Sequence, residues 1–147
     1  IKNLQWHNSK EKTLKLKKST SMYFAYGANM SRTSMSIRCP HAEPVRAFHL
    51  QGWRLVFDNH ATIVPEPGAT VAGCLWNITD LCEAHLDEFE GYPDYYNKCK
   101  IAQQGFTFMV YIMNPPLNFN NIPHQSYTDL LEEGYQDWNL SKTLNRV

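Results

Sequence analysis

The sequence of 147 residues lacks several patterns that mark large functional classes. It has no apolar run of about 20 residues and no apolar leader segment, so we expect no membrane span and no membrane partner. Its six histidines show neither H-x-x-x-H nor E-x-x-H spacing, and no C-x-x-C pair accompanies them, so we expect no metal site. The G-x-S-x-G motif of serine hydrolases is missing as well. What remains is the composition of an ordinary globular domain.

The four cysteines are scattered rather than paired. They stand at Cys39, Cys74, Cys82 and Cys99. Without a leader segment or a close pair, the cysteines favour reduced thiols in a cytoplasmic protein, and a disulfide is the less favoured alternative.

Charge is balanced overall but unevenly placed. The chain has 14 basic and 14 acidic residues, yet residues 1–21 hold six of the basic ones and one acidic one. The remainder is therefore mildly acidic, which argues against a nucleic-acid surface. Residues 1–21 are interpreted as a basic tail or an added extension, because Met22 stands directly before the first convincing strand. A nucleic-acid or membrane-binding arm is the alternative for this tail. Residues 22–147 have the size of a single domain, whose oligomeric state, monomer or homodimer, stays open.

Strands predominate in the expected order of elements, with helices inserted between them. This order predicts an α+β fold whose small mixed or antiparallel sheet curls into a barrel-like shape. Pro65-Glu66-Pro67-Gly68 is a strong turn signal, and Gly73 marks a bulge or a close backbone approach. The expected strands are 23–26, 47–50, 53–57, 70–77, 96–102 and 106–113. A first helix is expected after Asn29, and a third is expected over residues 125–133, before Gly134. Between them, a second helix is expected over residues 80–90, opened by an Asp80/Glu83 capping box and ended by Gly91.

The first strand ends abruptly at Gly27, and Asn29 is expected to cap a helix that runs through Met35. Glycine permits positive φ and a close ligand approach, and a helix start presents free N–H groups. The stretch thus predicts a small anion or oxyanion cradle. An ordinary strand-to-helix turn is the alternative.

Three acidic residues, Asp87, Glu88 and Glu90, crowd the last turn of the helix expected over residues 80–90. The helix dipole disfavours them there, and no Lys or Arg stands nearby in sequence to offset it. Glu90 shares a face with Leu86, so it should lie at the edge of the core. Partial burial, the helix end and Asp87 would each raise its pKa, as suits a general acid/base. A solvated acidic helix end is the alternative.

Taken together, these motifs resemble the gamma-glutamylcyclotransferase-like family between Met22 and Gly134. The residues that carry the resemblance are Tyr23-Phe24-Ala25-Tyr26-Gly27-Ala28-Asn29, Leu86-Asp87-Glu88-Phe89-Glu90-Gly91, Tyr111-Ile112-Met113 and Tyr127. The resemblance implies a small mixed barrel with helices. It also implies an enzyme that cyclises a gamma-glutamyl group to 5-oxoproline, releases an amine or amino acid, and needs no cofactor.

The resemblance assigns the general acid/base to Glu90 and substrate binding to two regions: the stretch from Tyr23 to Asn29, and the tyrosines Tyr127 and Tyr96, with Tyr95 as the alternative to Tyr96. Family members often have Ser where this chain has Ala28, so a hydroxyl contact is missing. A binding or regulatory module that keeps the pocket without turnover is the alternative function.

Overall fold

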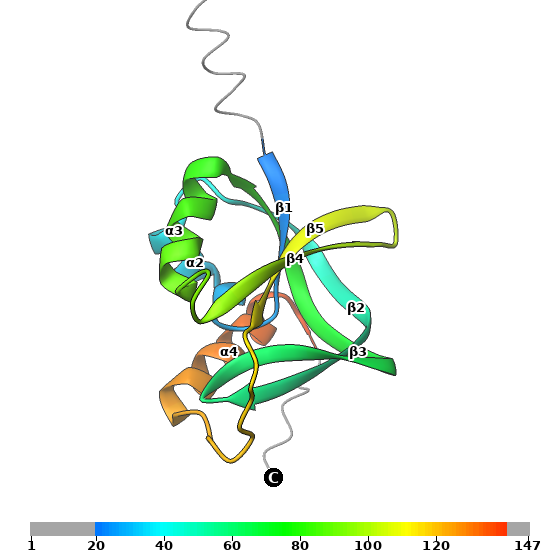
Figure 1. Cartoon of the computed structure of the whole chain (residues 1–147). Coiled ribbons are helices and arrows are strands. Elements are labelled where there is room, and N and C mark those ends of the chain that lie inside the picture. The colour runs from blue at the N-terminus through cyan, green and yellow to red at the C-terminus, as the bar shows by residue number, and fades with distance from the viewer. Residues whose placement is uncertain (1–19, 141–147) are drawn as a thin grey trace, which may run out of the picture.

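A computed structural model describes residues 20–140 of the chain (Figure 1). Five strands form one sheet in the order β2-β3-β1-β5-β4. β1 and β5 run parallel, whereas the other neighbouring strands are antiparallel, so the sheet is mixed and the predicted α+β class is confirmed. The strands are β1 (Thr20–Ala25), β2 (Glu43–Asp58), β3 (His60–Thr79), β4 (Tyr96–Gln103) and β5 (Phe106–Met113).

The central strand β1 carries the middle of the core. Phe24 is fully buried, and its ring centroid lies 5.8 Å from those of Phe48 and Phe108. On the neighbouring β3, a Cβ at Gly73 would overlap the carbonyl oxygen of Ala25 and would come 2.7 Å from the Phe24 ring. The close backbone approach predicted at Gly73 is therefore confirmed, because only glycine leaves room for the aromatic ring.

The region expected to hold two short strands around Gly52 is one long strand, so that prediction is wrong. Gly52 has φ 85° and lies within β2, where it makes a bulge rather than a hairpin. Across the ladder, Gln51 pairs with Thr70 but Trp53 pairs with Pro65, so residues 66–69 bulge out of β3. The turn predicted there does not reverse the chain; the reversal between β2 and β3 occurs at Asn59, with φ 61°.

Three α-helices and one turn of 3-10 helix complete the described part of the chain. They are η1 (Ala28–Met30), α2 (Arg32–Arg38), α3 (Asp80–Glu90) and α4 (Gln125–Asp137). Figure 1 shows the three helices on one side of β1, while β2 and β3 bow outward on the other side. The turn that joins β2 to β3 curves back to α4, where the Ala61 N–H donates to the Tyr127 hydroxyl. α4 continues through Gly134, where the chain was expected to leave the helix. A Cβ at Gly134 would stand 2.5 Å from Met30 Cβ, so this glycine lets α4 pack closely on η1.

The predicted bounds of α3 are confirmed, including the left-handed Gly91 (φ 66°) that ends it. Its cap differs from the expected Asp80/Glu83 box. Thr79 is the N-cap, and its hydroxyl accepts a hydrogen bond of 3.1 Å from the Cys82 N–H. Glu83 is left free to bind Lys98 on β4.

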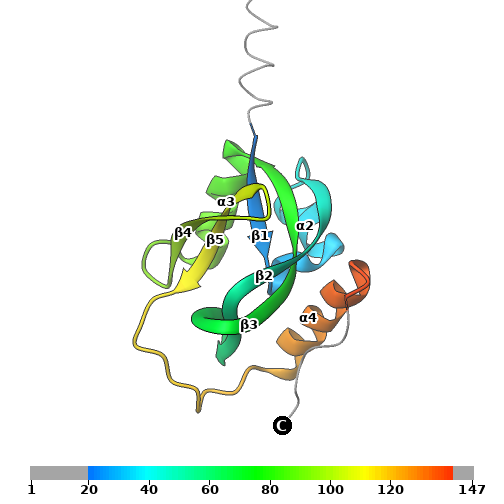
Figure 2. The ribbon, with the colours of Figure 1, turned by 90° about the vertical axis from the view of Figure 1, so that its right-hand side faces the viewer.

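The two edge strands, β2 and β4, approach each other where β4 ends. The Gln51 N–H donates to Gln103 Oε1 at 2.9 Å, and Gln103 Nε2 donates to the Gln51 carbonyl at 2.7 Å. A side-chain amide thus takes the place of a ladder pair. The sheet, seen from a second side in Figure 2, curls as predicted, although its strand order stays open.

A disulfide joins Cys39, the C-cap of α2, to Cys82 in the first turn of α3, with Cα atoms 5.1 Å apart. The expectation that all four thiols are reduced is therefore wrong for this pair, whereas Cys74 and Cys99 are free. Short cysteine motifs do not predict this pair, because the two cysteines are 43 residues apart in sequence.

Of the tail expected over residues 1–21, residues 1–19 lie outside the described part of the chain. Thr20 and Ser21 belong to β1 and pair with Thr79 and Ile78. Between residues 20 and 140, no helix is long and apolar enough to cross a membrane.

Candidate active site

A pocket of about 170 Å³ lies where the end of β1, η1, the end of α3, the start of β4 and α4 meet. Most of its wall is aromatic, and one carboxylate stands in it. Its lining residues are Tyr23, Tyr26, Gly27, Ala28, Asn29, His60, Ala61, Phe89, Glu90, Tyr95, Tyr96, Tyr111 and Tyr127.

Asn29 joins β1 to the end of α3 within the pocket. Its side chain is 2% exposed and, contrary to expectation, does not cap α2; Ser31 does so, through a 3.1 Å bond from the Ser34 N–H. Asn29 Nδ2 instead donates to the Tyr23 hydroxyl at 3.0 Å and to Glu90 Oε1 at 3.4 Å. The sequence stretch and the carboxylate singled out separately are thus brought together by one side-chain amide.

Gly27 has φ −121°, so it does not use the positive φ that glycine permits. Its small size still serves the pocket, because a Cβ at Gly27 would lie only 3.2 Å from the Tyr127 hydroxyl oxygen. η1 starts directly after Gly27, and its first hydrogen bond runs from the Met30 N–H to the Gly27 carbonyl. The N–H groups of Ala28 and Asn29 precede that bond and have no partner within the 3-10 turn, as at any helix start.

Glu90 is the last residue of α3 and is half-buried. Burial raises the pKa of Glu90 to about 7, and the positive charge of Arg38 opposes this rise. Desolvation disfavours the charged form of a carboxyl group, while a nearby cation favours it. Near neutral pH, Glu90 can therefore both accept and donate a proton.

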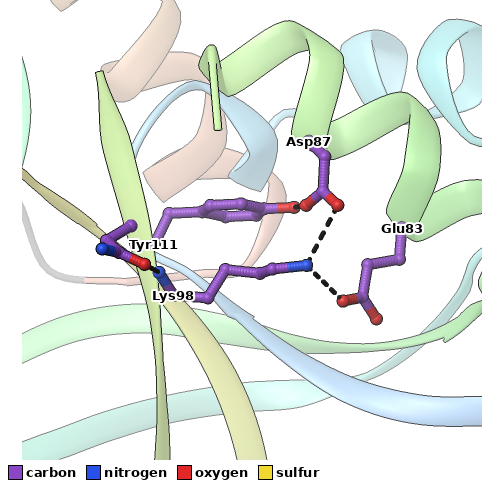
Figure 3. A network of polar contacts seen from close by, with 5 residues as sticks. Glu83, Asp87, Lys98 and Tyr111 are labelled. Atoms are coloured by element: carbon purple, nitrogen blue, oxygen red, sulfur yellow. Dashed lines mark hydrogen bonds and ion pairs between the residues drawn. The ribbon is translucent and has the colours of Figure 1, made fainter. Parts of the chain in front are cut away.

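Asp87, expected to raise the pKa of Glu90, is occupied elsewhere (Figure 3). Lys98 Nζ donates to Asp87 Oδ2 at 3.0 Å and to Glu83 Oε2 at 2.8 Å, and the Tyr111 hydroxyl donates to Asp87 Oδ1 at 2.6 Å. These bonds attach α3 to β4 and β5. Lys98 is also the cation that the acidic end of α3 lacks among its neighbours in sequence.

The pocket tyrosines are held by the backbone around them. Tyr26 donates to the Tyr111 carbonyl and Tyr96 to the Ala61 carbonyl, both at 2.6 Å. The Tyr127 hydroxyl accepts from the Ala61 N–H at 3.0 Å. Burial raises the pKa of each of the three phenols, Tyr26, Tyr96 and Tyr127, so they stay protonated at neutral pH. The wall is therefore fixed in position and uncharged.

The structure gathers most of the residues expected at the site in this pocket. Phe24 and Ala25 are the exceptions: they are buried beside the core and do not line it. Tyr95 and Tyr96 both line the pocket. The lining residues that sequence reasoning did not single out for the site are His60, Ala61, Phe89 and Tyr111.

His60 gives no sequence signal, because it gains its place only through the reversal between β2 and β3. Its Nδ1 lies 2.9 Å from the Tyr95 hydroxyl, and its ring packs edge-on against Tyr127 with centroids 5.0 Å apart. No group of three His, Cys, Asp or Glu side chains between residues 20 and 140 is placed to hold a metal ion. The polar groups that the described part of the chain brings to the pocket are the Glu90 carboxyl, the His60 imidazole, phenols, amides and backbone N–H groups.

Comparison with known proteins points to one family. The family model described as "Gamma-glutamyl cyclotransferase, AIG2-like" matches residues 23–139. A gamma-glutamylcyclotransferase from Mus musculus is 33% identical over 84 residues, which is 49% of this chain and 45% of that protein. The matching region thus spans less than half of the length of this curated relative.

Solved structures agree in fold. One of them, a gamma-glutamyl cyclotransferase, has a TM-score of 0.72 and 26% identity, with 84% of this chain and 83% of that chain covered. An uncharacterised protein from Homo sapiens has a TM-score of 0.70 and 23% identity, with 88% and 94% coverage.

Proposed function

Because the chain belongs to the gamma-glutamyl cyclotransferase, AIG2-like family, we propose that it cyclises the gamma-glutamyl group of a small substrate to 5-oxoproline. The product that leaves is an amine or an amino acid. The observation that carries the proposal is the half-buried Glu90, with a pKa of about 7, in a pocket beside the start of η1.

The substrate brings its own nucleophile, the α-amine, which is protonated in water. Glu90 in its carboxylate form accepts a proton from this ammonium group, and the free amine then attacks the γ-carbonyl carbon. A C–N bond forms and closes a five-membered ring, and the original γ-amide C–N bond breaks. Of the three ammonium protons, one stays in the lactam and two reach the departing nitrogen, relayed by Glu90. No other reactant is needed.

The remaining parts of the pocket support this reaction. The N–H groups at the start of η1 are suited to the oxyanion that develops on the γ-carbonyl or to the substrate carboxylate. Neutral, fixed tyrosines confine the substrate in a folded conformation, which brings the amine close to the carbonyl carbon. A pocket of about 170 Å³ suits a small molecule.

The test is the substitution Glu90→Gln, which keeps the size of the side chain and removes its proton exchange. We expect 5-oxoproline formation from gamma-glutamyl-L-alanine and gamma-glutamyl-methylamine, measured by mass spectrometry, to fall by about 100-fold or more, as is typical for a lost general acid/base. Glu88→Gln is the matched control, because Glu88 is exposed on the same turn and does not line the pocket.

Full activity in Glu90→Gln would contradict the role of Glu90. If the native protein binds these compounds, as measured by calorimetry, but forms no 5-oxoproline, the protein is a binding module that keeps the pocket, and the proposed reaction is wrong.

A further inference from the structure

Arg38 lies directly behind the pocket without lining it. It is the last residue of α2, and its guanidinium is half-buried between two pocket residues. Its Nη1 donates to Asn29 Oδ1 at 2.8 Å, and its Cζ lies 3.6 Å from the centroid of the Phe89 ring. The ion pairs formed among residues 20–140 are Arg54–Glu66 and those of Lys98, so no acidic partner accounts for its place there.

The bond to Asn29 decides which way its side-chain amide faces. An amide has an acceptor end and a donor end, and the two differ little in shape. A guanidinium only donates, so it can bind only the Oδ1 end. Asn29 Nδ2 is thereby directed to the Tyr23 hydroxyl and to Glu90 Oε1. The reversed amide would place a carbonyl oxygen against the Glu90 carboxylate.

The stack on Phe89 fixes the other side of the same site. Phe89 precedes Glu90 in α3, is 47% exposed and forms part of the pocket wall. A guanidinium over an aromatic face is attracted by the negative charge of the ring's π-electrons. Arg38 therefore ties the last turn of α3 to α2 at the residue next to the carboxylate.

We propose that Arg38 is a positioning residue for the cyclisation, acting through Asn29 and Phe89 to hold the Glu90 carboxylate and to present it with an N–H donor. This inference rests on the proposed function for its role in the reaction. Its contacts, and therefore its effect on Glu90, do not depend on turnover.

Glu90 is faced by charged and titratable groups from several elements. They are Tyr23 on β1, Tyr26 after it, Arg38 on α2, His60 at the start of β3, Tyr95 and Tyr96 around the start of β4, Tyr111 on β5 and Tyr127 on α4. Among residues 20–140, Arg38 is the cation whose charge acts on Glu90. Removing its charge should therefore raise the pKa of Glu90.

The test compares Arg38→Gln with Arg38→Lys, which keeps the charge but loses the planar guanidinium. For Arg38→Gln we expect kcat to fall about 10- to 100-fold with little change in KM, because the carboxylate is misplaced rather than the substrate lost. The acid limb of the plot of kcat/KM against pH should shift to higher pH by about 0.5–1 pH unit. This shift is smaller than the loss of a direct ion pair would cause, because Asn29 lies between the two charges. Arg38→Lys should lower kcat but leave the limb in place.

Arg32→Gln is the matched control. Arg32 belongs to the same helix, and its guanidinium also covers an aromatic ring, that of Trp138, at 4.1 Å. Unlike Phe89, Trp138 does not line the pocket. The loss of Arg32 should change neither kcat nor the acid limb.

A second readout does not need substrate. The carboxyl ¹³C resonance of Glu90, assigned by its absence in Glu90→Gln, gives the pKa directly. We expect it to rise in Arg38→Gln and to stay unchanged in Arg32→Gln. An unchanged Glu90 pKa in folded Arg38→Gln would overturn the inference, whatever the activity. If native protein forms no 5-oxoproline, the proposed function fails, and the NMR titration still decides whether Arg38 acts on Glu90.

Discussion

Folding moves the Glu90 carboxyl group partly out of water, so the native protein holds its proton more tightly than the unfolded chain does. The pKa rises from an ordinary 4.5 to about 7. Between these two values the native state binds more protons than the unfolded state, so the stability contributed by this group falls as pH rises. Above pH 7 the native protein carries a partly desolvated charge at its full cost. The same carboxylate is the form that the proposed reaction requires.

We therefore expect Glu90→Gln to stabilise the protein at pH 8, because glutamine has no charge to desolvate. The gain should be roughly 1–2 kcal/mol, less than the full pKa shift implies, since the side chain is partly exposed. It should shrink as pH falls toward 4.5, where Glu90 is neutral in the folded protein. Urea denaturation of both proteins at pH 5 and pH 8 measures the difference. If the difference in stability between Glu90→Gln and the native protein is the same at pH 5 and at pH 8, Glu90 has an ordinary pKa.

Sequence reasoning identified Glu90 because a helix period and a C-terminal glycine are local signals. It did not identify Arg38 or His60 as neighbours of the site. Each reaches the pocket through a long-range contact: Arg38 meets Phe89 across two helices, and His60 meets Tyr95 across 35 residues. No spacing rule encodes such a meeting, because it depends on how the elements pack.

At the scale of elements, the disulfide between Cys39 and Cys82 joins α2, which ends at Arg38, to α3, which ends at Glu90. We expect the double substitution Cys39→Ala/Cys82→Ala to destabilise the fold by about 2–4 kcal/mol, because a closed loop of this size restricts the unfolded chain. Guanidinium denaturation without reductant measures the loss.

Cys99→Ala serves as the control for this pair, because Cys99 is a free thiol, and it should change stability little. A double variant as stable as the native protein would show that the bridge contributes nothing to the fold.

The elements themselves were predictable where sequence signals are local and strong. The bounds of α3 follow from apolar periodicity and Gly91, and β5 from a continuous apolar run. Prediction failed at two glycines that were interpreted as ends of elements. Gly52 marks a bulge within β2, and Gly134, inside α4, makes room for Met30 of η1. A glycine shows that something needs space or positive φ, but the sequence does not say which.

At the scale of the whole molecule, Gln103 joins the two ends of the sheet through its bonds with Gln51. Replacing it by alanine leaves an N–H and a carbonyl of β2 to bind water instead. We expect Gln103→Ala to lower stability by at most about 1–2 kcal/mol and to speed hydrogen exchange at the Gln51 amide several-fold. Exchange followed by NMR measures this.

Lys100→Ala is the control, because Lys100 is exposed on the same strand, β4. Unchanged exchange at Gln51 in the glutamine variant would mean that the sheet edges stay together without this bridge.

Tyr127 lines the pocket, accepts a hydrogen bond from the Ala61 N–H and belongs to the last helix that the structure describes. On the ribosome, Glu90 is made 37 residues earlier than Tyr127. At translation rates of about 5–20 residues per second, Glu90 therefore precedes Tyr127 by roughly 2–7 s. A nascent chain that already carries the Glu90 carboxylate thus lacks the Tyr127 side of the pocket wall, which α4 supplies last.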